Sequence, residues 1–252
     1  MIESEQEKID KFESSGLLPA LRNRVRSFCA PLWWEVGGQT ILANATMCVV
    51  KTPTTLFGVT NEHVLKIYEK QKAENEDIFC QLGGGPFNLA ENLLSRSQQW
   101  DLATFRIPEI TLKHWGGSVF VSEAWPPKPI RKGDTVMLGG FPENRRTTTC
   151  GTRPKVVFND FVSFLAKADN SSDDHMSFCF DSSSWYWPQG TELEAHPNLS
   201  GASGGPCFRL VAESESIELA GFICEAGQNY EIIRVRQASL ISAEGLIQLS
   251  PI

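Results

Sequence analysis

Three residues of this 252-residue sequence could together perform acyl transfer: a serine, a histidine and an aspartate. Ser203 lies in the run Asn198-Leu-Ser-Gly-Ala-Ser-Gly-Gly-Pro206, directly before an apolar segment. Glycines allow the backbone to turn tightly, so that consecutive N–H groups can point at one substrate oxygen. Acyl transfer requires a hydroxyl nucleophile beside such donors, because they stabilise the oxyanion of the transition state. The run therefore predicts a nucleophilic serine, and a structural glycine turn is the alternative interpretation.

A serine hydroxyl needs a general base, and His63 is placed to supply one. It ends the β-rich run Phe57–His63 and precedes a short helical pattern. Asp101 stands before the apolar run Leu102–Ile107, where its carboxylate could orient the imidazole and stabilise the imidazolium cation. Each of these two residues alone also fits a purely structural role. Together with Ser203 they predict a catalytic triad.

The segments around these residues resemble the catalytic motifs of chymotrypsin-like (trypsin-fold) serine peptidases, closest in style to bacterial HtrA-like trypsin-like domains. The likeness rests on Gly-x-Ser-Gly-Gly-Pro at Ser203, Thr-Asn-Glu-His at His63 and Asp-Leu-Ala at Asp101. The chain order histidine, aspartate, serine is also the order of this family. The run Lys132–Pro142 resembles the first strand of the family's second barrel, and the resemblance covers residues 40–240.

The resemblance implies a mainly β fold of two packed antiparallel β-barrels (chymotrypsin-like), with short N-terminal helices. It implies a trypsin-like serine endopeptidase that acts on a protein or peptide through an acyl-enzyme on Ser203. The backbone N–H groups of Gly201 and Ser203 are the expected oxyanion hole. The expected substrate-binding residues are Pro197, near the base of the primary pocket, and Cys224, Glu225 and Ala226 on the substrate-pairing strand. This chemistry requires no cofactor and no metal ion.

Three positions depart from the secreted members of this family. Ala202 replaces the aspartate that pairs with a new amino terminus after zymogen cleavage, so activation of that kind is not expected. Val64 replaces a disulfide cysteine that directly follows the histidine. Cys224 stands where the family commonly has a serine that supports the triad aspartate. We therefore expect Asp101 to be held in a different way.

Apolar spacing predicts the elements that must position these residues. A polar helix is expected within residues 1–15, and a second helix is expected around Leu21 and Val25; both are expected to pack on the outside of the main fold. Helical turns are expected over Val64–Lys70. Strands are expected over Thr40–Val50, Thr55–Thr60, Ile78–Leu82, Leu102–Ile107, Ser118–Val121, Thr135–Gly139, Lys155–Val157, Ser177–Phe180, Gly205–Val211, Glu218–Cys224 and Tyr230–Val235.

The proline-rich run Trp125–Ile130 is stiff and extended in character, which suits a connector between two subdomains. We therefore expect four parts. They are an N-terminal helical extension (1–30), a first β-barrel with the histidine and aspartate (31–124), a connector (125–133) and a second β-barrel with the nucleophile and the substrate-pairing strand (134–252).

Composition excludes some partners and favours one compartment. A formal net charge of −7 argues against a nucleic-acid partner, because such proteins usually carry a basic face that displaces phosphate counterions. No apolar run has the length of a membrane span or of a secretory leader, so we expect no membrane partner and a cytoplasmic location. Seven cysteines without a Cys-x-x-Cys pair are simplest to explain as reduced, buried thiols, although disulfides remain open.

Two other functions are compatible with the same residues. The chain could be a catalytically silent trypsin-fold binding module, although such modules usually lose one triad residue. It could also be an esterase or acyl transferase that uses the same triad. Peptide and ester substrates tested side by side would separate these functions.

Overall fold

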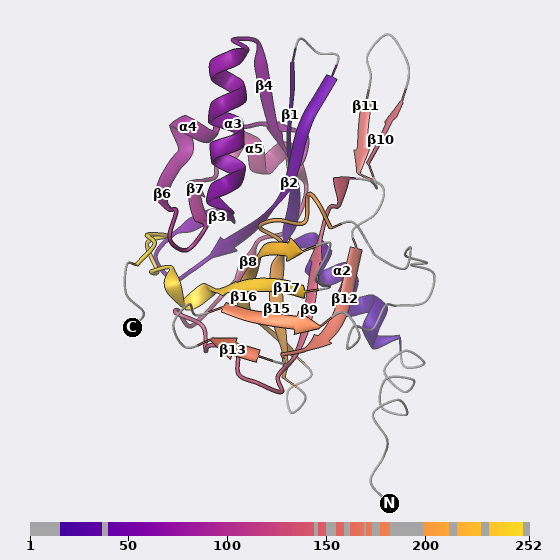
Figure 1. Ribbon diagram of the computed structural model, residues 1–252, viewed down its shortest axis with the longest axis vertical. Coiled ribbons are helices and arrows are strands. Elements are labelled where there is room, and N and C mark those ends of the chain that lie inside the picture. The colour runs from indigo at the N-terminus through magenta and orange to yellow at the C-terminus, as the bar shows by residue number, and fades with distance from the viewer. Residues whose placement is uncertain are drawn as a thin grey trace, which may run out of the picture.

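Two large β-sheets and four α-helices make up most of the residues described by the structure, a computed structural model (Figure 1). It describes residues 16–36, 40–143, 146–149, 155–158, 162–168, 170–172, 177–181, 199–211, 216–227 and 232–248. The helix expected within residues 1–15 and the residue Pro197 lie outside these ranges. None of the helices in these ranges is long and apolar enough to cross a membrane.

The first sheet carries the histidine and the aspartate. Its described strands are β1 (Cys29–Val36), β2 (Thr40–Lys51), β3 (Leu56–Thr60), β4 (Ile78–Leu82), β5 (Gly85–Pro86), β6 (Leu93–Ser97), β7 (Leu102–Arg106) and β8 (Phe120–Val121). They lie in the order β5-β4-β1-β2-β3-β7-β6, and β8 pairs with β2. Every pair is antiparallel except β2 with β8. Three helices belong to this half: α3 (Glu62–Glu74), α4 (Leu89–Asn92) and α5 (Glu109–Trp115).

The second sheet carries the serine. Its described strands are β9 (Thr135–Gly140), β12 (Val162–Lys167), β13 (Asn170–Ser172), β14 (Ser177–Asp181), β15 (Pro206–Val211), β16 (Ser216–Gly227) and β17 (Ile232–Gln237). They lie in the order β12-β9-β15-β16-β17-β14-β13. A separate antiparallel hairpin, β10 (Arg146–Thr149) with β11 (Lys155–Phe158), projects beside the first sheet in Figure 1. The predicted class, mainly β with two antiparallel units, is confirmed.

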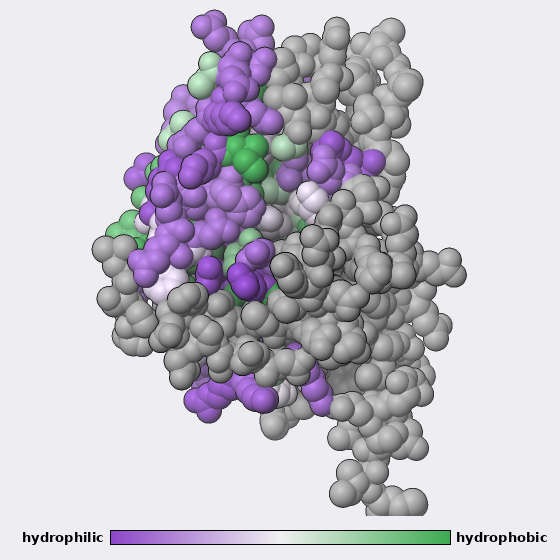
Figure 2. Space-filling view, in the orientation of Figure 1, coloured by the Kyte–Doolittle hydropathy of each residue, from purple (hydrophilic) through white to green (hydrophobic). Residues whose placement is uncertain are grey.

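Helix α3 covers one face of the first sheet and shows why a sequence of this pattern is helical. Val64, Leu65 and Tyr68 recur at helical spacing and are buried, whereas Lys66 and Lys70 on the same helix are exposed. Figure 2 shows hydrophilic side chains over this part of the surface. The helix therefore fixes its first turn, which contains the histidine, against a rigid sheet.

The helix α2 (Leu17–Ser27) is part of the core, which corrects the expectation that it packs on the outside. Leu21 and Val25 are buried in the same cluster as Phe57 of the first sheet and Phe208 of the second. Apolar side chains of both sheets thus close over one face of this helix. The two halves and α2 share this core cluster, so they stabilise one another.

The strand β1 is absent from the sequence-based expectations, and it begins before the expected start of the first barrel at residue 31. Both of its faces are buried: Cys29 belongs to the cluster shared by the sheets, and Leu32 and Trp34 belong to a second cluster beneath α3. A strand buried on both faces has no alternation of apolar and polar residues. Pro31 further masked the strand pattern.

Phe208 offers a test of the shared core. Its side chain is fully buried, and its ring lies 5.1 Å from that of Phe120 and 5.9 Å from that of Phe28, measured between centroids. Phe208→Ala should lower the free energy of unfolding by about 3–5 kcal/mol, because it removes buried apolar area and leaves a cavity. Urea denaturation followed by tryptophan fluorescence measures the change.

The control is Ile110→Ala, because the Ile110 side chain is 52% exposed. This substitution should change the free energy of unfolding by less than about 0.5 kcal/mol. Equal effects of the two substitutions would contradict a core shared by the two sheets.

Candidate active site

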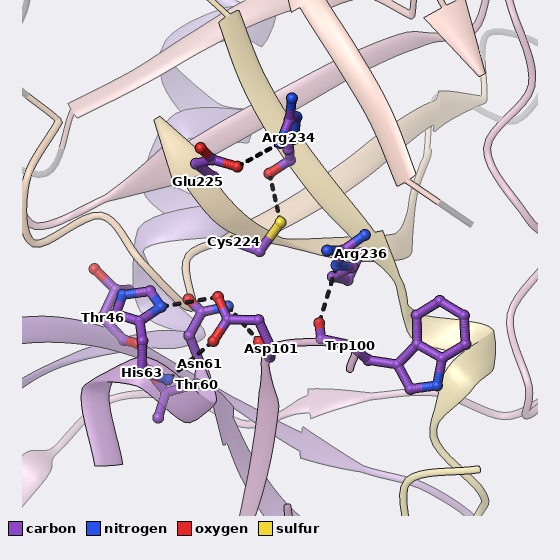
Figure 3. Close-up of polar contacts among 10 residues, drawn as sticks. All are labelled: Thr46, Thr60, Asn61, His63, Trp100, Asp101, Cys224, Glu225, Arg234 and Arg236. Atoms are coloured by element: carbon purple, nitrogen blue, oxygen red, sulfur yellow. Dashed lines mark hydrogen bonds and ion pairs between the residues drawn. The ribbon is translucent and has the colours of Figure 1, made fainter. Parts of the chain in front are cut away.

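His63 and Asp101 meet because their strands are neighbours. β3 and β7 pair antiparallel with Thr60 opposite Ala103, so the end of β3 and the start of β7 lie together. His63 Nδ1 is 2.8 Å from Asp101 Oδ2, and the His63 backbone N–H donates to Asp101 Oδ1 at 2.9 Å (Figure 3). A carboxylate only accepts hydrogen bonds, so Nδ1 carries the proton and Nε2 can accept one.

The backbone at Asp101 is held in a conformation that few residues adopt. Its φ is 50°, in the left-handed region, which aspartate tolerates better than most residues. Buried Asn61 donates from Nδ2 to the Asp101 carbonyl at 2.8 Å, and Arg236 donates from Nε to the Trp100 carbonyl at 2.9 Å (Figure 3). These two side chains hold the peptide groups on either side of the turn.

Neither Asn61 nor Arg236 was identified from the sequence. Asn61 lies two residues before His63 and could have been found from that position, because a polar side chain there can reach the chain that follows the aspartate. Arg236 lies 135 positions after Asp101 in the sequence. No local pattern identifies such a partner, because Arg236 lies on β17 of the second sheet, whereas Asp101 directly precedes β7 of the first sheet.

Most peptide groups of the loop around Ser203 are hydrogen-bonded, either within the loop or to neighbouring segments. Three N–H groups donate hydrogen bonds of 2.8 Å: that of Ala202 to the Leu199 carbonyl, that of Gly204 to the Ile223 carbonyl and that of Gly205 to the Ala202 carbonyl. The N–H groups of Gly201 and Ser203 donate to no residue in the part of the chain that the structure describes. Gly201 has φ 92° and Gly204 has φ 84°, values that favour glycine. The loop therefore keeps two donors uncommitted.

Hydrogen bonds to the neighbouring carbonyls fix the directions of these two donors. The Ser200 carbonyl accepts from the Glu143 N–H at 2.6 Å, and the Ala202 carbonyl accepts from Gly205. In a trans peptide the N–H points opposite to the C=O. The Gly201 N–H therefore points away from Glu143, and the Ser203 N–H points away from Gly205. Both are available to an acceptor outside the loop.

The loop packs onto the strands that lead to the histidine. The Thr46 N–H donates to the Ser203 carbonyl at 2.9 Å. A Cβ on Gly204 would lie 2.2 Å from the Thr46 carbonyl oxygen and 2.8 Å from the Cα of Thr60, so the backbones touch there. Thr60 precedes His63 by three residues. Between these described residues no hydrogen bond joins Ser203 Oγ to His63, and such bonds often tighten only when substrate binds.

Cys224 does not take the place of a serine that binds the aspartate. It lies at a register shift in β16, between Ile223 and Glu225, and its Sγ donates to the Arg234 carbonyl at 3.3 Å (Figure 3). The two carboxylate oxygens of Asp101 accept from the backbone N–H and Nδ1 of His63. Burial raises the pKa of the Cys224 thiol to about 12, with Arg236 opposing the shift and Asp101 adding to it.

The expected substrate-binding residues that the structure describes lie together on β16. β15 pairs with this strand only from Ser216 to Phe222, so among the described strands the same edge is open beyond Ile223. Glu225 is exposed and forms an ion pair with Arg234 at 2.8 Å. Ala226 lies opposite Ile233 of β17.

No metal site is evident at these residues. Among the residues that the structure describes, no group of three or more histidine, cysteine, aspartate or glutamate side chains could hold a metal ion. The chemistry available here is proton transfer by His63 and donation by backbone N–H groups.

Comparison with known proteins gives matches in structure. No protein-family model and no curated sequence matches the chain. The thermostable serine protease AL20 from an extremophilic microorganism matches with a TM-score of 0.50 at 11% identity, over 84% of this chain and 92% of that one. The Rv3671c protease of M. tuberculosis, in its active form, gives 0.49 at 17% identity, over 87% and 82%. A serine endoprotease of Yersinia pestis gives 0.49 at 15% identity, over 87% of this chain and 63% of that one.

The thiol of Cys224 provides a test of the site's geometry. With a pKa of about 12, only about 1 in 10⁴ molecules carries the thiolate at pH 8, and the side chain is buried. N-ethylmaleimide should leave Cys224 unmodified in the native protein and modify it in urea, as peptide mapping by mass spectrometry can show. Rapid labelling of Cys224 in the native protein would contradict this placement.

The raised pKa of the Cys224 thiol also makes the stability of the fold depend on pH. Since the folded state favours the protonated thiol, the contribution of this group to the free energy of unfolding is complete below pH 9 and is lost between pH 9 and 12.

Proposed function

We propose that this chain, which has the chymotrypsin-like serine protease fold, is a serine endopeptidase that hydrolyses peptide bonds through an acyl-enzyme on Ser203. The observation that carries the proposal is the pair of hydrogen bonds, 2.8 and 2.9 Å long, by which Asp101 orients His63. An imidazole held in this way, free to take the proton of a glycine-bounded serine, is what acyl transfer needs.

The reaction begins when His63 Nε2 takes the proton of Ser203 Oγ as Oγ attacks the carbonyl carbon of the substrate. The oxyanion that forms accepts hydrogen bonds from the Gly201 and Ser203 N–H groups. His63 then gives its proton to the amide nitrogen, the C–N bond breaks and the amine leaves. Water attacks the acyl-enzyme and loses a proton to His63. The C–Oγ bond then breaks as His63 gives this proton to Ser203 Oγ, which releases the acid product and the free enzyme. Asp101 stabilises the His63 imidazolium during both the formation and the hydrolysis of the acyl-enzyme.

The substrate is proposed to be an extended protein or peptide segment that pairs with the open edge of β16 at Cys224–Ala226. Exposed main-chain groups at a sheet edge bind such a segment by hydrogen bonds, whatever its sequence. Glu225 belongs to this segment, and it forms an ion pair with Arg234 of β17, the strand on the opposite edge of β16. Pro197 remains the proposed base of the primary pocket.

A reducing compartment such as the cytoplasm is proposed for this protein. Five cysteines in the described ranges, Cys29, Cys48, Cys80, Cys207 and Cys224, are buried and free. Cys29 and Cys48 are among them although they lie directly opposite one another on β1 and β2. Buried free thiols persist where glutathione and thioredoxin keep them reduced, which supports this location.

The proposal is tested by incubating the protein with a peptide library and, in parallel, with small p-nitrophenyl esters. The wild type should cleave peptides, and Ser203→Ala or His63→Ala should reduce the turnover about 10⁴-fold or more. The controls are Ser118→Ala and His114→Ala, because both side chains are exposed and lie on or next to α5; they should retain wild-type turnover.

The other outcomes would indicate a different function or a different nucleophile. Hydrolysis of esters without peptide cleavage would indicate an esterase or acyl transferase. Absence of both activities, with peptides still bound, would indicate a binding module. Peptide cleavage that survives Ser203→Ala would contradict the proposed nucleophile.

A further inference from the structure

Thr46 of β2 binds the nucleophile loop through both its side chain and its backbone. Its side chain is fully buried, and its hydroxyl donates to the Gly201 carbonyl at 2.9 Å while accepting from the Phe141 N–H at 2.9 Å. Its backbone N–H binds the Ser203 carbonyl, and its own carbonyl accepts from the Thr60 hydroxyl at 2.9 Å. One residue of the first sheet thus holds both ends of the Gly201–Ser203 segment.

Asn44 completes this contact from the same face of β2. It lies two positions before Thr46, so both side chains point to the same side of the strand. Asn44 Nδ2 donates to the Phe141 carbonyl at 2.9 Å, and Thr46 binds the Phe141 N–H. The backbone of Phe141 is therefore bound on both sides. We call Asn44 and Thr46 the β2 clamp.

The surroundings leave no space for the loop to move sideways. A Cβ on Gly201 would lie 2.5 Å from Asn44 Nδ2 and 2.8 Å from the Phe141 carbonyl oxygen. A Cβ on Gly140 would lie 2.8 Å from the Ala202 Cα and 3.0 Å from the Thr46 hydroxyl oxygen. The clamp, the end of β9 and the loop are therefore packed backbone to backbone, and the hydroxyl of Thr46 lies between them.

We propose that Thr46, assisted by Asn44, is a positioning residue that holds the loop so that the Gly201 and Ser203 N–H groups stay available to an oxyanion. This inference rests on the proposed function and adds the group that preorganises its oxyanion hole. The Ala202 side chain, a methyl group, offers no charge with which to anchor the loop. The anchor comes from the first sheet, through the hydroxyl that fixes the Gly201–Ala202 peptide.

The chemistry of the hydroxyl predicts what its loss does. Valine has nearly the same shape as threonine, so Thr46→Val removes the hydroxyl that binds the Phe141 N–H and leaves the buried Gly201 carbonyl without this donor. Buried peptide groups do not tolerate that state and rearrange to find partners. The loop then samples other conformations in which the two donors no longer face the substrate together. Thr46→Ser keeps the hydroxyl and should restore the wild-type behaviour.

Hydrogen–deuterium exchange of the peptide that contains residues 199–205 tests the clamp without reference to activity. We expect exchange in this segment to be at least 10-fold faster in Thr46→Val than in the wild type and unchanged in Thr46→Ser. The matched control is Thr111→Val, since the buried Thr111 hydroxyl binds the Pro86 carbonyl at 2.7 Å, far from the loop. This control should leave residues 199–205 as protected as in the wild type.

Peptide hydrolysis by the same variants tests the positioning role. Removal of one oxyanion donor costs about 10²–10³-fold in kcat, so mispositioning by Thr46→Val should lower kcat about 10- to 100-fold with little change in KM. Thr46→Ser and Thr111→Val should keep the wild-type kcat. If Thr46→Val does not fold, Asn44→Ala, at a partly exposed position, should show the same two changes to a smaller extent.

The outcomes separate the clamp from the function. Unchanged exchange in Thr46→Val, or faster exchange with an unchanged kcat, would overturn the positioning role. A wild type without hydrolytic activity would overturn the proposed function, and the exchange measurement would still decide whether Thr46 holds the loop. If exchange of residues 199–205 is accelerated to the same extent in Thr111→Val, the positioning role of Thr46 is also overturned, since general destabilisation would then explain the result.

Discussion

The site depends on the contact between Thr46 and the nucleophile loop, where a strand of the first sheet binds the backbone of the second half. The Thr46 N–H holds the Ser203 carbonyl, and the Thr46 hydroxyl holds the Gly201 carbonyl. His63 follows the neighbouring strand β3, so the same contact sets the serine relative to the histidine. Phe141, whose N–H the Thr46 hydroxyl also binds, belongs to the core cluster shared by α2 and both sheets.

Glycines and positive φ angles occur at this contact and at Asp101. Gly204 lets the loop approach Thr46 and Thr60 more closely than any side chain would allow, and Gly201 has a positive φ against Asn44. Asp101 adopts a positive φ as well, and the hydrogen bonds from Asn61 and Arg236 to adjacent carbonyls offset the cost of that conformation. The strain thus lies beside the groups proposed to act on substrate.

Sequence motifs predicted the fold class and the residues of the proposed triad, because each motif is local and combines glycine, polar and apolar positions in a short run. Strand β1 was missed because both of its faces are buried, and α5 was missed because its few residues show no clear period. Thr46 and Arg236 could not be recognised, because they act through backbone groups far away in the sequence. Pro197 lies outside the described residues and stays a prediction.

The most direct test of the account is labelling of the native protein with a fluorophosphonate, with the adduct located by mass spectrometry. Such a probe phosphonylates only a serine whose hydroxyl is activated by a base and whose oxyanion is stabilised. We expect one adduct, on Ser203, which is lost in His63→Ala. An unlabelled protein under native, reducing conditions, or an adduct on another residue, would contradict it.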